Sequence, residues 1–431
     1  MDLNNKKIIN AWCMYDWANS VYSLVITTAV FPIYFEAVTK SADGSNIVSF
    51  FGWELPNTVL YSYALSFSFL FTAFLLPLLT GMADYGGKKK LFLKIFAYMG
   101  SIACVSLFFF NGQNIEFGIL MTIIASVGFS GSLVFYNAFL PEIVTPDRYD
   151  RISARGYSYG YLGSVLLLIL NLMMIQMPHL FGLPEGTLPA RISFLLVGFW
   201  WAGFAQIPFL RLPNNVNKRN KNESLLKKGY DEIVKVYKSL ENLPNLKKYL
   251  ISFFFYNAGV QSVMYLATLF GSVELNLETS SLILIIIIIQ IVGIGGSYLF
   301  ARVSEAKGNV YSLTIMIIIW IGVCFAAYFV KTEFQFYTLA FVAGLIMGGI
   351  QALSRATYTK LIPENSIDNA SYFSFFDVTF NVSIVMGTFA YGLIDHITGS
   401  MRNSALALTL FFIIGLGTLL FVKIPVTKKD N

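Results

Sequence analysis

The chain has 431 residues, of which 56% are hydrophobic and 16% aromatic. Only 13% are charged, whereas soluble domains carry about 25%. This composition excludes a soluble globular protein and a disordered chain. Three cysteines in apolar surroundings and two widely separated histidines provide neither a disulfide framework nor a zinc cluster. We therefore expect no metal site and no cofactor.

Twelve stretches of the chain are long and apolar enough to cross a bilayer as helices of roughly 20 residues. One long polar segment separates the sixth stretch from the seventh. The sequence therefore predicts an all-α integral membrane protein with an N-terminal half (1–212), a basic connector (213–248) and a C-terminal half with a short tail (249–431). The predicted spans are 10–34, 58–80, 91–110, 117–140, 156–177, 192–210, 249–270, 280–301, 310–330, 336–354, 371–394 and 404–422.

Lysine and arginine residues indicate the orientation, because positively charged loops stay on the cytoplasmic side. If the chain crosses the membrane twelve times, 26 of the 30 lysine and arginine residues fall on the side that holds both termini and the connector. The other four fall on the opposite side. Both termini are therefore predicted to be cytoplasmic. Short loops, and the lack of an Asn-x-Ser/Thr sequence in the predicted outward loops, fit a bacterial plasma membrane. The formal net charge of +6 is read as this orientation signal, so no nucleic-acid partner is expected.

The connector has two interpretations. Leu225, Ile233, Val236 and Leu240 recur among lysines, which is typical of a helix that lies on anionic lipid. The alternative, which we favour, is a solvated tether between the halves.

Two loop patterns recur in both halves. Asp84 and Gly87 follow the second span, and Glu305 and Gly308 follow the eighth, 221 residues later. An acid at a helix end can face the positive N-terminus of a neighbouring helix, and a glycine allows a tight turn. Such contacts can hold a gate shut, although ordinary loop capping is the alternative.

A second repeat places an acid after a proline at a helix end, with Glu142 after the fourth span and Glu364 after the tenth, 222 residues apart. Matching loops of this kind indicate two related halves that move against each other around a central site. The predicted gating residues are Asp84, Gly87, Glu142, Arg155, Glu305, Gly308 and Glu364.

Polar stripes mark four of the spans. Asp16 and Asp377 are the acids inside spans, where a charge is costly and usually faces the bundle interior. We expect a central cavity in which one of them neutralises a substrate ammonium group or carries a proton. The alternative for the uncharged members is that they join helices by hydrogen bonds. The predicted substrate-binding or coupling residues are Asp16, Asn19, Tyr157, Tyr161, Asn257, Gln261, Asp377 and Asn381.

Neither a glycine-rich nucleotide loop nor a nucleophile with a histidine partner is visible, so the sequence predicts neither ATP-driven pumping nor an enzyme.

Four motifs carry a resemblance to a known family, namely Tyr15 to Ser20, Ala83 and Asp84 with Gly87, Arg155 to Gly163, and Phe255 to Gln261. In these motifs the chain resembles the major facilitator superfamily, and within it the vacuole effluxer-like family, which includes autophagy-related vacuolar amino-acid permeases and bacterial members. The resemblance covers essentially the whole chain. The chain departs from the pattern in two places, the loop after the second span and the seventh span. The superfamily loop has a glycine four positions before its acid and a basic residue after it, where this chain has Thr80 and Tyr85; family members often carry an acid at Ala258.

The resemblance implies the major facilitator fold, with two six-helix bundles, and secondary transport by alternating access, with amino acids as the leading substrate class. We therefore expect a small-molecule substrate, the lipid bilayer and protons as partners, and no obligatory protein partner. A drug, sugar or organic-acid carrier on the same fold is the first alternative. The second is a non-transporting receptor or lipid-handling protein.

Overall fold

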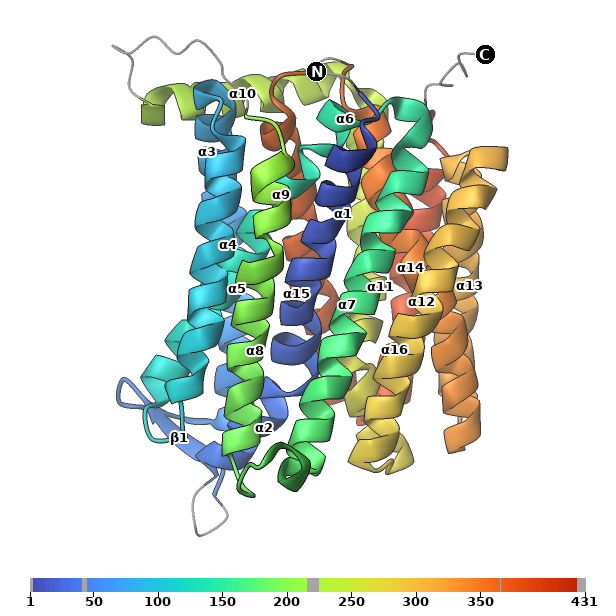
Figure 1. Ribbon diagram of the computed structural model, residues 1–431. Coiled ribbons are helices and arrows are strands. Elements are labelled where there is room, and N and C mark those ends of the chain that lie inside the picture. The colour runs from blue at the N-terminus through green and yellow to red at the C-terminus, as the bar shows by residue number, and fades with distance from the viewer. Residues whose placement is uncertain (1–2, 41–44, 215–224, 365, 425–431) are drawn as a thin grey trace.

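The computed structural model of the chain describes residues 3–40, 45–214, 225–364 and 366–424. Twelve helices in this part of the chain are long and apolar enough to cross a membrane, as predicted. They run alongside one another (Figure 1). Helix α1 begins and helix α16 ends at the same end of the bundle, which we call the termini face, and the opposite end is the far face.

Each half contributes six spans. The N-terminal half comprises α1 (Lys6–Val21), the π-helical segment η1 (Tyr22–Ala29), α2 (Phe31–Thr39), α3 (Asn57–Gly86), α4 (Lys89–Ser106), η2 (Leu107–Phe109), α5 (Ile115–Asn137), α6 (Leu140–Ile143), η3 (Pro146–Arg148), α7 (Tyr149–Gln176), η4 (Pro178–Phe181), α8 (Leu188–Phe204) and α9 (Gln206–Arg211). The C-terminal half comprises α11 (Pro244–Leu275), α12 (Thr279–Lys307), α13 (Asn309–Phe329), α14 (Glu333–Leu361), α15 (Asn369–Thr398) and α16 (Met401–Leu419).

The two halves meet along two pairs of surfaces. Helix α7 packs against α12 and α14, and helix α15 packs against α3 and α5. Within the C-terminal half, α12 and α14 approach so closely that a Cβ atom on Gly348 would overlap the carbonyl of Gly293. Glycine is therefore required at this crossing, as in other close helix contacts in membranes.

The first span is interrupted, which differs from the unbroken helix predicted over 10–34. In η1, the Val30 N–H donates to the Val25 carbonyl, five residues back rather than four. Helix α2 then starts at Phe31 with Pro32 in its first turn. Segments of π-helix are rare and often occur at functional sites.

Two predicted boundaries also change. Helix α14 continues to Leu361, well beyond the predicted end at 354, so Arg355 lies inside a span and not in a loop. Helix α11 begins at Pro244, so the last residues of the predicted connector belong to the seventh span.

The connector contains helix α10 (Leu225–Ser239) and the turn η5 (Leu240–Asn242). Helix α10 lies across the termini face (Figure 1) and packs against α3, where Gly229 abuts Met82. The Lys235 ammonium also pairs with the Asp368 carboxylate of the C-terminal half at 2.8 Å. The described part of the connector is therefore a packed helix and not the solvated tether that we favoured, and it touches both halves.

A β-hairpin at the far face was not predicted. Strands β1 (Ile47–Phe50) and β2 (Trp53–Pro56) pair antiparallel, with Val48 opposite Leu55. The hairpin occupies the loop between α2 and α3 (Figure 1).

Candidate functional site

A small cavity lies between the two halves, near the middle of the spans. Its volume is about 90 Å³, and it is bordered by η1 on one side and by α11, α12 and α14 on the other. None of its lining residues is charged. They are Ser23, Leu24, Thr28, Gln261, Met264, Tyr265, Ala267, Thr268, Ile285, Ile286, Ile289, Gln290, Met347 and Gln351.

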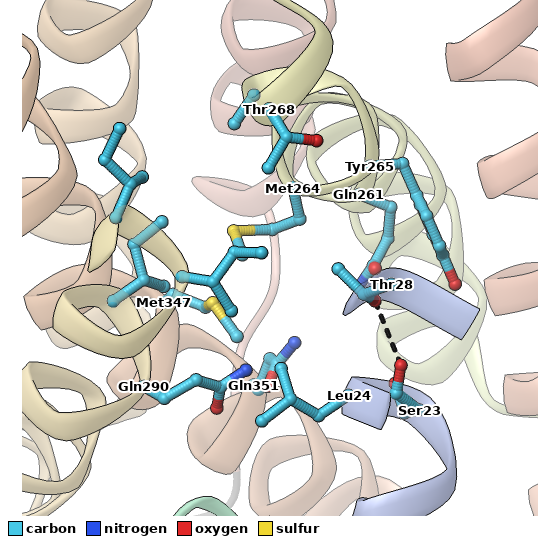
Figure 2. Close-up of a pocket in the computed structure, with 14 residues that line it drawn as sticks. Ser23, Leu24, Thr28, Gln261, Met264, Tyr265, Thr268, Gln290, Met347 and Gln351 are labelled. Carbon is cyan, nitrogen blue, oxygen red and sulfur yellow. Dashed lines mark hydrogen bonds between the residues drawn. The ribbon is translucent and has the colours of Figure 1, made fainter. Parts of the chain in front are cut away.

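Three glutamine amides provide the main polar groups of the cavity, and Figure 2 shows them with the Met264 and Met347 side chains. The Gln351 Oε1 atom accepts a hydrogen bond from the Tyr161 hydroxyl at 2.6 Å. The Gln290 Oε1 atom is buried without a hydrogen-bond partner. An orphaned buried carbonyl is costly unless a ligand or water satisfies it, so Gln290 marks a position at which a solute could donate.

A buried ion pair lies on the termini side of the cavity. The Asp16 carboxylate and the Arg355 guanidinium join α1 to α14 at 3.3 Å, and the Tyr136 hydroxyl donates to Asp16 at 2.7 Å. Because Arg355 is one helical turn from Gln351, the pair lies about 6 Å from the cavity along α14, toward the termini face. Its charges therefore balance each other beside the cavity rather than inside it.

Several residues of the N-terminal half contact the Arg355 side chain. Its Nε atom donates to the Ser153 hydroxyl at 2.9 Å, and one Nη atom donates to the Asn137 side chain at 3.2 Å. The guanidinium also lies over the rings of Trp12 and Tyr157, at 4.7 Å and 4.3 Å from their centroids. A planar guanidinium can stack on aromatic rings and donate several hydrogen bonds at once, which the ammonium group of a lysine cannot do in the same way.

A further set of contacts, which we call the termini gate, joins the halves at the termini face in two arms. In the first arm, the Asp84 carboxylate accepts from the Ser371 N–H at 2.7 Å, from its hydroxyl at 2.8 Å, and from the Ala370 N–H. An acid at the start of α15 is stabilised by the helix dipole. Lys89 lies 3.7 Å from Asp84 and also pairs with Glu142, which accepts from Asn369.

In the second arm, the Asp150 carboxylate on α7 accepts from Ser304 at 2.9 Å, from Asn309 at 2.8 Å and from Lys360 at 2.7 Å. Asp150 precedes Ser371 by 221 residues, the same offset that separates Asp84 from Glu305. The acid therefore lies on α3 in the first arm but at the start of α7 in the second. Asp150, and not the predicted Glu305, is therefore the acid of the second arm, and the Glu305 side chain is exposed.

Asp377 has a different environment from the other acids. It is 8% exposed, and its carboxylate accepts from the Asn381 side chain, one turn along α15, at 2.7 Å. On the neighbouring α11, Gln261 donates to Asn257 at 3.3 Å, and Asn257 donates to Ser383 of α15 at 2.6 Å. A polar chain thus links the cavity to α15.

The structure brings some of the predicted residues to the cavity and leaves others outside it. Of the eight predicted binding or coupling residues, Gln261 lines the cavity. Tyr161 and Asn257 each form a hydrogen bond with a glutamine that lines the cavity, Gln351 and Gln261 respectively. Asp16 and Tyr157 lie with Arg355 in a cluster that we call the ion-pair centre, on the termini side of the cavity. Asp377 and Asn381 pair with each other on α15. Asn19 is buried one turn from Asp16, with neither side-chain polar atom bonded.

The predicted gating residues divide in the same way. Asp84 and Glu142 lie in the termini gate, and Gly87 ends α3 with a φ of 59°, which favours glycine. Gly308 separates α12 from α13 with a φ of 91°. Glu305 and Glu364 are exposed beside an open groove at the termini face, which Arg155 also lines, so the structure does not bring these three into the gate.

Sequence reasoning missed Arg355, Asp150, Gln290 and Gln351. The predicted tenth span, 336–354, ends one residue before Arg355, because the apolar stretch ends there. A signal was nevertheless available, since Gln351 and Arg355 are spaced four residues apart and therefore share a helix face.

The chain has the major facilitator fold, with a small uncharged cavity between its two halves. Solved structures with this fold include the human organic anion transporter MFSD10 (TETRAN), with a TM-score of 0.74, 11% identity and coverage of 97% of this chain and 100% of that one. Another is the E. coli fucose:proton symporter FucP, with a TM-score of 0.69, 12% identity and coverage of 97% and 98%.

Proteins that are related in sequence identify the family. The chain is 31% identical over 414 residues to the uncharacterized MFS-type transporter YxiO of Bacillus subtilis, covering 96% of this chain and 94% of that one. It is 24% identical to autophagy-related protein 22-1 of Penicillium rubens, covering 93% and 80%. Residues 4–431 match the family described as vacuole effluxer Atg22 like, and the chain belongs to that family.

Proposed function

We propose that this transporter moves neutral amino acids across a bacterial plasma membrane by alternating access, coupled to protons. The termini face is then the cytoplasmic face, as the distribution of lysine and arginine indicates. The described state is closed toward the cytoplasm, since the termini gate and the Asp16–Arg355 pair join the halves on that side.

One observation carries the proposal, namely that the cavity combines uncharged amide and hydroxyl groups with a hydrocarbon wall. Amides both donate and accept hydrogen bonds, so Gln261, Gln290 and Gln351 can meet the carboxylate and the ammonium of one zwitterion. Ile285 and Met264 offer an apolar surface for its side chain. An organic acid carries a net charge that this lining does not balance.

The proposal is tested with purified protein in proteoliposomes, by counterflow of labelled neutral amino acids compared with empty vesicles. We expect counterflow of at least one amino acid. Sugars and dicarboxylates in the same assay test whether the protein is instead a sugar or organic-acid carrier. If only those solutes exchange, the amino-acid proposal fails. If no solute in the panel exchanges, a non-transporting receptor or lipid-handling protein becomes the better account.

Variants locate the site. Gln290→Ala should weaken apparent affinity about 2- to 10-fold, as expected for a lost hydrogen bond of 0.5–1.5 kcal/mol. Gln206→Ala is the matched control, because Gln206 lies outside the cavity and bonds to Tyr98 and to the Ala202 carbonyl. Equal affinities for the two variants would show that the substrate binds elsewhere.

A further inference from the structure

Asp377 is a buried acid with no lysine or arginine partner in the described part of the chain. The other buried acids all have one. Asp16 pairs with Arg355, Asp84 with Lys89, Asp150 with Lys360, and Asp368 with Lys235.

An ionised carboxylate without a counter-charge is expensive in the membrane interior. The Asn381 amide donates one hydrogen bond to the Asp377 carboxylate, which offsets only part of that cost. A bound cation would cancel the charge. A metal cation requires several oxygen ligands, whereas the hydrogen-bond partner here is an amide nitrogen that donates. A proton needs only the carboxylate itself.

We propose that Asp377 takes up and releases the coupling proton, an inference that rests on the proposed function. Protonation converts its carboxylate to a neutral carboxylic acid, and release returns the proton to water. Asp16, the other acid first considered for this role, already has its charge balanced by Arg355 and instead joins the halves.

Helix α15 connects this carboxyl group to both functional regions. Ser371, in the first arm of the termini gate, lies six residues before Asp377, about 9 Å along the helix. Ser383, six residues after it, accepts from Asn257, which in turn bonds to Gln261 at the cavity. A change of charge at Asp377 therefore acts on the helix that bears the gate contact and reaches the cavity.

Several titratable groups on the neighbouring elements have other partners, and Tyr265 of α11 lines the cavity. Asp84 of α3 and Lys235 of α10 meet the start of α15, Tyr136 of α5 bonds to Asp16, Tyr256 of α11 bonds to Ser354, and Arg402 of α16 pairs with Glu274 near the far face.

The test compares wild type, Asp377→Asn and Asp395→Asn in proteoliposomes, using an amino acid that wild type exchanges. Asp395 lies on the same helix, outside the cavity and the gate. For one proton per solute, a one-unit pH gradient supports about a tenfold concentration ratio. We expect Asp377→Asn to lose this accumulation yet retain counterflow, and Asp395→Asn to keep both. Gradient-driven accumulation by Asp377→Asn would overturn the inference, as would accumulation driven by sodium in place of protons.

A second readout requires no transport. Infrared difference spectra of the purified protein, recorded across a pH titration, should show a carboxylic-acid carbonyl band that appears on acidification and is absent in Asp377→Asn but present in Asp395→Asn. Identical spectra for all three proteins would exclude a titrating Asp377. If wild type exchanges no amino acid but the band is present, the proposed function fails while the proton site stands.

Discussion

The Asp16–Arg355 pair shows how single residues join the two halves of this protein. Both side chains are almost fully buried, and the residues lie 339 positions apart in the chain. A buried pair adds little net stability, but removing one partner leaves an uncompensated charge that costs about 3–5 kcal/mol. The pair therefore makes the closed state sensitive to the loss of either member.

Arg355→Gln should lower the thermal unfolding midpoint of the purified protein, because it leaves the Asp16 carboxylate buried without its cation. The double variant Asp16→Asn with Arg355→Gln should recover much of the loss, since no charge remains. Thermal unfolding monitored by fluorescence measures both. An unfolding midpoint of Arg355→Gln equal to that of wild type would contradict the claim that the closed state depends on this ion pair.

Sequence reasoning at this scale found the acids but not their partners. Asp16 and Asp377 stand out as charges in apolar stretches, and both lie buried in spans. Whether such an acid is paired depends on contacts across the interface between halves, which helical spacing does not reveal. Arg355 was misplaced because a cation at the edge of an apolar run looks the same in a sequence whether it faces water or a buried acid.

Helix α10 shows how an element outside the membrane spans contributes to closure. It packs on α3 and is joined to α15 by the Lys235–Asp368 ion pair and by a hydrogen bond between Ser239 and Tyr372 at 2.8 Å. Burial opposes the charge on Lys235, but hydrogen bonds with Asp368 and Glu232 outweigh it and raise the pKa of Lys235 to about 12. With a raised pKa, Lys235 keeps its charge at neutral pH and loses it only as the pH rises toward 12.

Lys235→Ala with Ser239→Ala should make the termini face open more readily. Because the Lys235 side chain is 58% exposed, its ion pair contributes only about 0.2–1 kcal/mol, so its loss should shift the opening equilibrium by about 1.4- to 5-fold. The rate at which a thiol reagent labels a cysteine introduced at Thr359 reports the opening. Lys238→Ala is the control, and equal labelling in the control and the double variant would rule out a clamp.

The sequence predicted spans better than breaks in them. Apolar length alone located all twelve spans, since a bilayer demands it. The π-helical segment η1 and the β-hairpin depend on local backbone hydrogen bonds, and nothing in the hydropathy of 10–34 or 47–56 distinguishes them from an ordinary helix and loop.

At the scale of the whole molecule, the hydrogen bonds described between the halves lie at the cavity wall, where Tyr161 meets Gln351, or on the termini side of the cavity. The Ser158 and Ser297 hydroxyls meet at 2.6 Å between α7 and α12, and Ser153 donates to the Ala352 carbonyl at 2.7 Å. These contacts, the ion-pair centre and the termini gate form successive layers of closure. Opening this face requires all of them to separate, which is the movement that alternating access demands.

The most direct test of this movement is to tie the halves together. Ser158→Cys with Ser297→Cys, in a protein whose three buried cysteines are replaced by alanine, places two thiols where the hydroxyls now meet, within reach of a disulfide. We expect oxidation to abolish counterflow and a reductant to restore it, with either single cysteine unaffected. Counterflow at the unlinked rate by the fully oxidised double variant would contradict the account, because the halves would then not need to separate for transport.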